Sequence, residues 1–224
     1  FMRARADAPR YRIVPGPAVF CAFLCLFVAM LSGRLVAQKP TVIVVAGAHG
    51  EGEFAADFAA QLAAWAKVSA QADATHLAIG ETETEGVPDR DRLKLALEAE
   101  EKNGSGELWL VFVGHGTFDG KEAKLNLRGP DLSATDLAEW LKPFRRPLAI
   151  IDTTSSSAPF LAKLAAPGRV IVSATRSGHE QNYARFGKFL AEALPDPKSD
   201  LDKDGQVSLL ESFLSASHRT AEFY

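Results

Sequence analysis

Four carboxylates lie within twelve residues near the end of the sequence, at spacings that suit a metal ion. Asp200, Asp202 and Asp204 alternate along the chain, Gly205 follows them, and Glu211 ends the segment. Carboxylate oxygens are ligands that calcium prefers, and carboxylates this close together repel one another strongly unless a cation lies between them. The segment 200–211 therefore predicts a calcium-binding loop.

The same segment resembles the loop of an EF-hand, which has oxygen ligands at positions 1, 3, 5, 7, 9 and 12 and a glycine at position 6. The ligands expected here are Asp200, Asp202, Asp204, the backbone carbonyl of Gln206, Ser208 and Glu211. The alternative is an acidic surface turn that caps the helix beginning near Val207. Pro195 and Pro197 interrupt the entering helix, so we expect the site to be a structural clamp rather than a paired calcium sensor.

Two other polar segments combine a histidine with hydroxyl side chains. His115 lies between Gly114 and Gly116 directly after an apolar run, and residues 152–157, with the sequence Asp-Thr-Thr-Ser-Ser-Ser, follow the apolar run at 148–151. An open α/β sheet places its chemistry in the loops at the carboxyl ends of its strands. A histidine after one strand and a hydroxyl-rich loop after another therefore predict a base beside a nucleophile.

These two loops resemble those of the caspase-like cysteine peptidases, most closely the legumain family. That family carries a His-Gly after one strand and an acidic-x-Cys-x-Ser-Gly loop after the next. The resemblance extends from Thr41 to about Leu194. It implies that His115 is the catalytic histidine, that Asp152 is the acidic residue before the nucleophile, and that Thr154 takes the nucleophile's position.

Threonine at the nucleophile's position indicates a degenerate, non-catalytic site. A threonine hydroxyl is not ionised near neutral pH and is hindered by its methyl group, whereas a cysteine thiolate is a strong nucleophile. Two alternatives stay open. One is a hydrolase that uses Ser155 or Ser156 with His115 as its base, and the other is an ordinary Ser/Thr-rich turn beside an unrelated histidine. Arg176, after the last expected strand, is a candidate to bind an acidic side chain of a ligand, with a surface salt bridge as its alternative role.

The elements that must position these residues alternate short apolar runs with helical periodicity, a pattern typical of βαβ units. We expect strands at 41–46, 75–79, 108–113, 148–151 and 169–174, and an edge strand or hairpin at 124–127. Helices are expected over 54–65, from 88 to about 103, from 133 to 141, over 160–165, over 186–194 and from 207 onward. The predicted fold class is α/β with a mostly parallel sheet. The resemblance implies the caspase-like three-layer sandwich, followed by the EF-hand-like loop and helix.

The first 38 residues differ in character from the rest of the sequence. Arginines between positions 3 and 12 precede an apolar run at 18–31, and a small-residue site follows near Ala37. This order predicts a secretory signal peptide, with an uncleaved membrane anchor or a misread start as alternatives. Both cysteines, Cys21 and Cys25, lie in the apolar run, so a chain cut near Ala37 has neither a disulfide nor a cysteine nucleophile.

Composition sets the remaining expectations. The chain has 224 residues and a formal net charge of −3, without the concentration of Lys and Arg that a nucleic-acid partner requires.

We divide the chain into the leader 1–38, an α/β domain 39–194 and a calcium-binding segment 195–224. The sequence predicts an exported, non-catalytic calcium-binding protein that binds a peptide or protein. An active hydrolase and a calcium-stabilised adhesion module are the alternatives.

Overall fold

The computed structural model describes residues 38–50, 52–82 and 86–224. Residues 1–37 of the predicted leader, which include both cysteines, therefore lie outside the described residues. The described residues form one compact unit. No helix in the described ranges is long and apolar enough to cross a membrane.

The centre of this unit is a five-stranded parallel sheet with the order β2-β1-β3-β7-β8. Its strands are β1 (Thr41–Ala46), β2 (Thr75–Ile79), β3 (Leu108–Val113), β7 (Leu148–Asp152) and β8 (Arg169–Ser173). These bounds agree with the sequence prediction to within one residue at each end. The strands β1, β3 and β7 are apolar nearly throughout because helices cover both of their faces.

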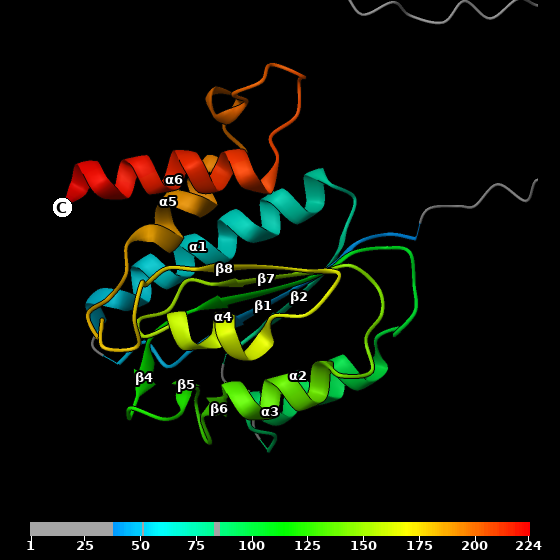
Figure 1. Cartoon of the computed structure of the whole chain (residues 1–224), viewed down its shortest axis with the longest axis vertical. Coiled ribbons are helices and arrows are strands. Elements are labelled where there is room, and N and C mark those ends of the chain that lie inside the picture. The colour runs from blue at the N-terminus through cyan, green and yellow to red at the C-terminus, as the bar shows by residue number, and fades with distance from the viewer. Residues whose placement is uncertain (1–37, 51, 83–85) are drawn as a thin grey trace, which may run out of the picture. The chain divides into compact units, whose positions relative to one another are not determined.

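In the described part of the chain, five α-helices flank the sheet and a sixth, α6, packs on the outside of α5 (Figure 1). They are α1 (Gly52–Gln71), α2 (Asp89–Ala99), α3 (Ala134–Leu141), α4 (Ala158–Leu164), α5 (Phe186–Ala193) and α6 (Leu209–Phe223). α2, α3 and α4 pack on the face formed by residues such as Ile43 and Leu110. α1 and α5 pack on the opposite face, around Val44 and Val111, and Ala216 of α6 joins the same apolar cluster. The result is a three-layer α/β sandwich.

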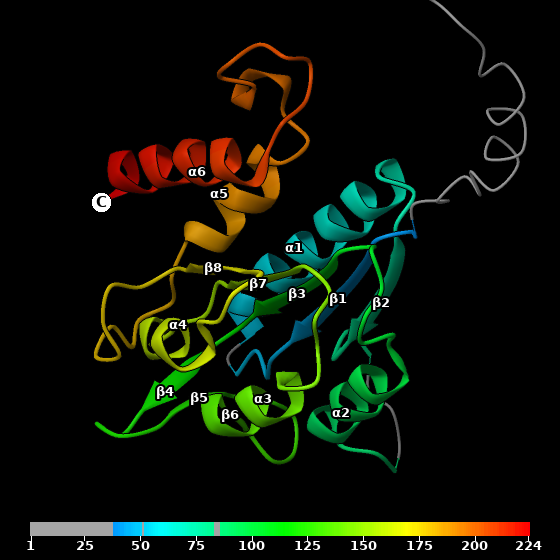
Figure 2. The same ribbon diagram turned by 45° about the vertical axis from the view of Figure 1, so that its right-hand side comes forward.

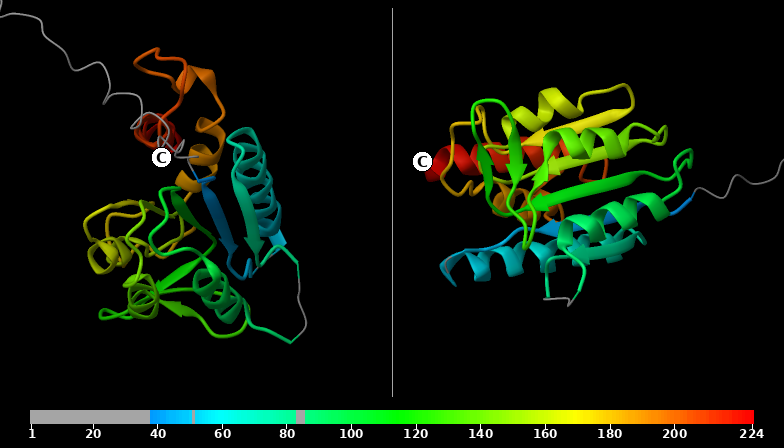
Figure 3. Two further views of the ribbon diagram at one scale, coloured as in Figure 1. Left: turned by 90° about the vertical axis from the view of Figure 1, so that its right-hand side faces the viewer. Right: turned by 90° about the horizontal axis from the view of Figure 1, so that it is seen from below.

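A second, smaller sheet is antiparallel and consists of β4 (Gly116–Phe118), β5 (Ala123–Leu125) and β6 (Leu132–Ser133). It begins directly after His115 and lies at the carboxyl end of the central strands (Figure 3, right panel). The sequence indicated only the segment at 124–127. The strands β4 and β6 are too short for an alternating pattern to reveal them.

Two of the helices begin at side-chain caps. Ser133 caps α3 by accepting a hydrogen bond from the backbone N–H of Asp136. Ser208 and Glu211 form a capping box at the start of α6. α2 ends at Ala99, several residues before the expected end, because the backbone of Glu100 is extended, and the ammonium group of Lys102 donates to the carbonyl oxygens of the last turn.

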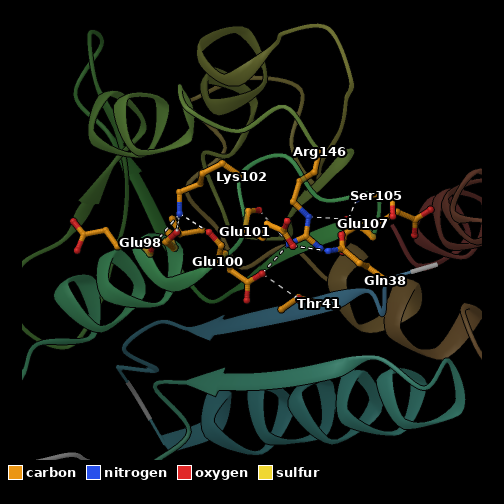
Figure 4. A network of polar contacts seen from close by, with 11 residues as sticks. Gln38, Thr41, Glu98, Glu100, Glu101, Lys102, Ser105, Glu107 and Arg146 are labelled. Atoms are coloured by element: carbon orange, nitrogen blue, oxygen red, sulfur yellow. Dashed lines mark hydrogen bonds and ion pairs between the residues drawn. The ribbon is translucent and has the colours of Figure 1, made fainter. Parts of the chain in front are cut away.

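A buried arginine ties the amino-terminal ends of the strands together (Figure 4). The guanidinium group of Arg146 donates to Gly106 O (2.6 Å), Glu107 O (3.1 Å) and Glu100 Oε2 (2.8 Å). The hydroxyl of Thr41 donates to the same Glu100 oxygen. This network lies at the opposite end of the sheet from His115, so its role is structural.

Candidate functional site

The histidine and the hydroxyl-rich loop come together at the carboxyl edge of the sheet. His115 follows β3 and Thr154 follows β7, and these strands are hydrogen-bonded neighbours with Phe112 opposite Asp152. The predicted juxtaposition of the two loops is therefore present in the fold. The side chains within the loops point in different directions, which decides what chemistry they can perform.

Thr154 points into the protein. Its side chain is fully buried, and its hydroxyl donates to Asp152 Oδ1 at 2.6 Å. The same oxygen of Asp152 accepts the backbone N–H of Thr154 at 3.1 Å. The residue that we predicted at the nucleophile's position is thus inaccessible to a substrate, and its proton is directed at a carboxyl group rather than at an imidazole.

Asp152 is also enclosed, with 1% of its surface exposed. Burial raises the pKa of this carboxyl to about 7, against the opposing effect of the two hydrogen bonds from Thr154. Its Oδ2 atom has no hydrogen-bond partner among the described residues. A carboxyl in this environment holds a proton more readily than an exposed aspartate does.

The serines of the loop serve mainly to join it to its neighbours. Ser155 Oγ accepts the N–H of Gly116 (3.0 Å), and it lies 3.2 Å from the Gly116 carbonyl, to which it can donate. Ser156 has φ of 55° and a buried hydroxyl with no partner among the described residues. Ser157 Oγ contacts the hydroxyls of Ser173 and Thr175. Ser155 also lines a cavity, which is described below.

Gly116, the residue after His115, is in a position with no room for a side chain. A Cβ atom at Gly116 would lie 2.3 Å from the carbonyl oxygen of Ser155 and 3.0 Å from Thr154 Oγ1. No side chain fits there without separating the two loops. The His-Gly pair in the sequence therefore reflects the close approach of β4 to the 152–157 loop.

His115 is half-buried within a cluster of aromatic rings. The centroid of its imidazole lies 4.9 Å from that of Phe54, 5.4 Å from that of Phe58 and 6.0 Å from that of Tyr183. Burial lowers the pKa of His115, and the backbone of His49 opposes this effect. The imidazole makes no hydrogen bond to a hydroxyl of residues 153–157. It does line, together with Ser155 and Lys124, a cavity of about 470 Å³.

A second cavity of about 780 Å³, which we call the α6 cleft, lies beside the first. One wall comes from the segment between β8 and α5 and includes Arg176, Tyr183 and Arg185; the other comes from α6 and includes Phe213 and Tyr224. Arg176 is exposed and forms no salt bridge with any described residue. Gln181 lines both cavities, so the two adjoin.

The predicted calcium ligands lie in a loop that projects from the end of α5 (Figure 2, orange). Asp200, Asp202 and Asp204 each place a carboxylate oxygen within 4.8 Å of the others. Asp200 Oδ2 accepts the N–H of Gly205 at 3.0 Å, while Asp200 Oδ1 is buried without a partner among the described residues. A carboxylate oxygen without a hydrogen-bond partner, next to two other carboxylates, is suited to bind a cation. The chemistry of these three side chains is therefore compatible with calcium.

Glu211, the expected closing ligand, joins this loop to α6. Its Oε1 accepts the N–H groups of Leu201 (2.8 Å) and Asp202 (3.2 Å), and its Oε2 accepts the N–H and hydroxyl of Ser208 (both 2.8 Å). These hydrogen bonds, led by those from Ser208, lower the pKa of Glu211 to about 2. Gln206, whose carbonyl is the expected fourth ligand, is exposed in the same loop.

Several residues around the site gave no functional signal in the sequence. Phe54 and Phe58 fall within the helix predicted over 54–65, where apolar residues are expected to face the core, and their contact with His115 depends on how α1 packs on the sheet. Tyr183 and Gln181 lie in an irregular segment where periodicity carries no information. Only tertiary packing brings them to His115 and to both cavities.

Comparison with known proteins agrees with this architecture. No protein-family model and no curated protein sequence matches the chain. Among solved structures it is similar to the Drosophila initiator caspase Dronc, with a TM-score of 0.51 and 11% sequence identity over 96% of this chain and 87% of that chain. The parallel sheet, its flanking helices and this similarity show that the chain has a caspase-like α/β fold.

Proposed function

We propose that this protein is a non-catalytic member of the caspase-like group, with legumain-type loops, that binds calcium and a peptide or protein ligand. The orientation of the Thr154 side chain is the main support for the proposal that the protein is not catalytic. Its fully buried hydroxyl donates to Asp152, so it meets neither a substrate carbonyl nor a base. Nucleophilic catalysis needs an oxygen or sulfur atom that reaches both.

Binding is supported by the two adjoining cavities at the carboxyl edge of the sheet, where α/β folds place their ligands. Their volumes lie in the range of cavities that hold small ligands or short peptides, about 300–1,000 Å³. His115 lines one of them and packs against the rings of Phe54 and Phe58, which adds an aromatic surface for a ligand to contact.

Calcium binding is supported by the three clustered aspartates, by the unpaired Asp200 Oδ1 atom and by the spacing of the ligands in the sequence. When bound, calcium neutralises the charge of this loop. The ion would be held by Asp200, Asp202 and Asp204, with Gln206, Ser208 and Glu211 as further ligands. We propose that it fixes the loop between α5 and α6 as a structural clamp.

Incubation with a peptide library, with and without calcium, tests the proposal. We expect capture of peptides without cleavage. Turnover that is lost in the variant His115→Ala would contradict the non-catalytic function. If no peptide is captured under any condition, the proposed binding function is wrong, and the calcium-stabilised adhesion module becomes the favoured alternative.

One observation favours a second candidate, a hydrolase that uses Ser155. Ser155 and His115 line the same cavity, which Thr154 does not reach. Turnover that is lost in Ser155→Ala but retained in Thr154→Val would establish this alternative. The hydrogen bonds of Ser155 to Gly116 disfavour it, because attack would break them.

We also propose that residues 1–38 direct export, since their order of charge, apolar run and small residues is that of a signal peptide. Amino-terminal sequencing of the protein from its native source tests this. A new terminus near Ala37 indicates cleavage, whereas retention of the apolar run in a membrane fraction indicates an anchor. An uncleaved chain in the soluble fraction would contradict export.

A further inference from the structure

Tyr183 lies between the two cavities of the site. Its ring packs against His115, with 6.0 Å between the ring centroids, and against Phe54 at 5.2 Å. His115 lines the smaller cavity, which we call the His115 cavity, whereas Tyr183 lines the α6 cleft. Two rings that contact each other and border different cavities form a shared wall. The position of the Tyr183 ring therefore decides whether the two spaces are separate.

The segment that carries Tyr183 has no regular structure to fix this ring. Residues 181–185 follow β8 and precede α5, and they belong to neither a helix nor a strand. The carbonyl oxygen of Tyr183 accepts a long hydrogen bond, 3.5 Å, from the hydroxyl of Tyr224, which is itself exposed. The backbone is thus held weakly, and the orientation of the ring depends on contacts of the side chain.

Gln61, on α1, provides the polar contact of this side chain. Gln61 is 3% exposed, and its Nε2 atom donates to the hydroxyl of Tyr183 at 2.9 Å. Its Oε1 atom is buried without a hydrogen-bond partner in the described part of the chain. A buried carbonyl without a partner costs folding free energy, and an apolar residue of similar length would avoid that cost. The hydrogen bond to Tyr183 therefore accounts for Gln61 better than packing does.

The start of α5 leaves room for the same amide group. Gly187 is buried in the first turn of α5. A Cβ atom at Gly187 would lie 2.6 Å from Gln61 Oε1 and 2.7 Å from Thr153 Oγ1, so no side chain fits there. The amide of Gln61 is enclosed between α5 and Thr153, and it has little freedom to turn away from Tyr183.

We propose that Gln61 positions Tyr183 as the wall between the His115 cavity and the α6 cleft, and that this wall limits the length of the ligand that can span them. A ligand in the α6 cleft reaches His115 only when the Tyr183 ring turns aside. Short ligands therefore bind with the ring in place, and longer ones do not. The inference rests on the peptide or protein binding proposed above, and it adds which residues restrict the ligand. Gln61 acts through Tyr183 and is a positioning residue.

Modification of His115 by diethyl pyrocarbonate measures how open the wall is in the full chain. The reagent reacts with accessible neutral imidazoles, so the reaction is run at pH 8, and mass spectrometry gives the rate at each histidine. His218, whose side chain is 74% exposed, is the internal standard. Gln61→Leu removes the donor, Gln61→Glu keeps a partner for the Tyr183 hydroxyl, and Tyr183→Ala removes the ring. Gln71→Leu is the matched control, because Gln71 is exposed at the end of the same helix.

We expect the rate at His115, relative to His218, to rise about two- to tenfold in Gln61→Leu, the range for loss of one neutral hydrogen bond, and to rise further in Tyr183→Ala. Gln61→Glu and Gln71→Leu should react at the parental rate. Burial lowers the pKa of His115, so an NMR titration of Tyr183→Ala should show this pKa rising toward its ordinary value of 6.5. An unchanged rate at His115 in Tyr183→Ala would overturn the wall.

Tyr183→Phe removes the same hydrogen bond from the other side and keeps the ring, so it replaces Gln61→Leu if that variant does not fold. A parental rate at His115 in both of these variants would overturn the role of Gln61 and leave the wall in place.

Capture from random libraries of three-residue and eight-residue peptides tests the limit on ligand length. We expect the share of eight-residue peptides to be larger for Tyr183→Ala than for the parent protein, and an equal share would overturn the limit. Absence of capture by both proteins would overturn the proposed binding function and the length limit with it. The rates at His115 would then still decide whether Tyr183 forms the wall.

Discussion

The hydroxyl of Thr154 and the carboxyl of Asp152 form a closed pair at the end of β7, with 2.6 Å between their oxygens and almost no exposure of either residue. The hydroxyl of Thr154 thereby satisfies a buried carboxyl, and it is not available to react with a ligand. The pair also makes the loop sensitive to substitution in ways that can be measured.

Replacement of Thr154 by valine should lower stability and leave ligand binding unchanged. Valine keeps the shape of threonine but removes the donor to Asp152, which leaves a buried acceptor less satisfied at a cost of about 1–3 kcal/mol. Urea unfolding measures this loss. Thr154→Ser, which keeps the hydroxyl, is the control and should lose less. If peptide binding weakened in Thr154→Val while stability stayed the same, Thr154 would belong to the ligand site.

The buried Asp152 predicts a specific dependence of stability on pH. Its pKa is raised from the ordinary value of 3.8 to about 7 by burial. As pH rises through this window the unfolded chain releases the proton while the folded chain keeps it, so the folded state loses stability, and the loss is constant above the window. The full effect is on the order of 4 kcal/mol, at about 1.4 kcal/mol for each pKa unit.

Asp152→Asn tests this dependence, since the amide does not titrate and its oxygen can still accept from Thr154. We expect the free energy of unfolding to fall less between pH 4 and pH 7 in the variant than in the parent protein, measured by urea titration at several pH values. Identical pH profiles would show that Asp152 is ionised in the fold.

Calcium should raise the melting temperature. An ion that binds the folded state alone adds about 2.7 kcal/mol when its concentration is a hundredfold above its dissociation constant. For a domain of this size that corresponds to roughly 5–10 °C. Scanning calorimetry in calcium and in EGTA measures the difference, and the double variant Asp202→Asn, Asp204→Asn should lose it. A melting temperature that EGTA does not change would contradict the structural clamp.

The network at the other end of the sheet is expected to be stabilising and functionally silent. Arg146→Met removes the donor to three backbone and side-chain oxygens and leaves Glu100 without its ion pair, at a cost of about 3–5 kcal/mol. Lys142→Met, which breaks only an exposed pair with Glu139, is the control and should cost less than about 1 kcal/mol. Similar losses in the two variants would show that the buried network adds nothing.

The sequence predicted the central sheet well because parallel strands buried on both faces, such as Leu108–Val113, read as continuous apolar runs. It predicted less where local pattern is weak. α2 ends where Glu100 becomes extended, a change that no residue pattern marks, and the strands β4 and β6 exist only because β5 lies between them. At the site, residue types and loop order were readable, but side-chain direction was not: nothing local shows that Thr154 points inward or that Tyr183 contacts His115.

The reciprocal hydrogen bonds between Ser155 and Gly116 have a consequence for how this protein can change over time. The serine hydroxyl satisfies both polar backbone groups of a residue that is itself buried. Any substitution that turned Ser155 toward a substrate would leave those groups unpaired, and so would lose folding stability before it gained reactivity. A single substitution in this loop is therefore expected to be selected against. Conversion to an enzyme would require a second, compensating substitution in β4 at the same time.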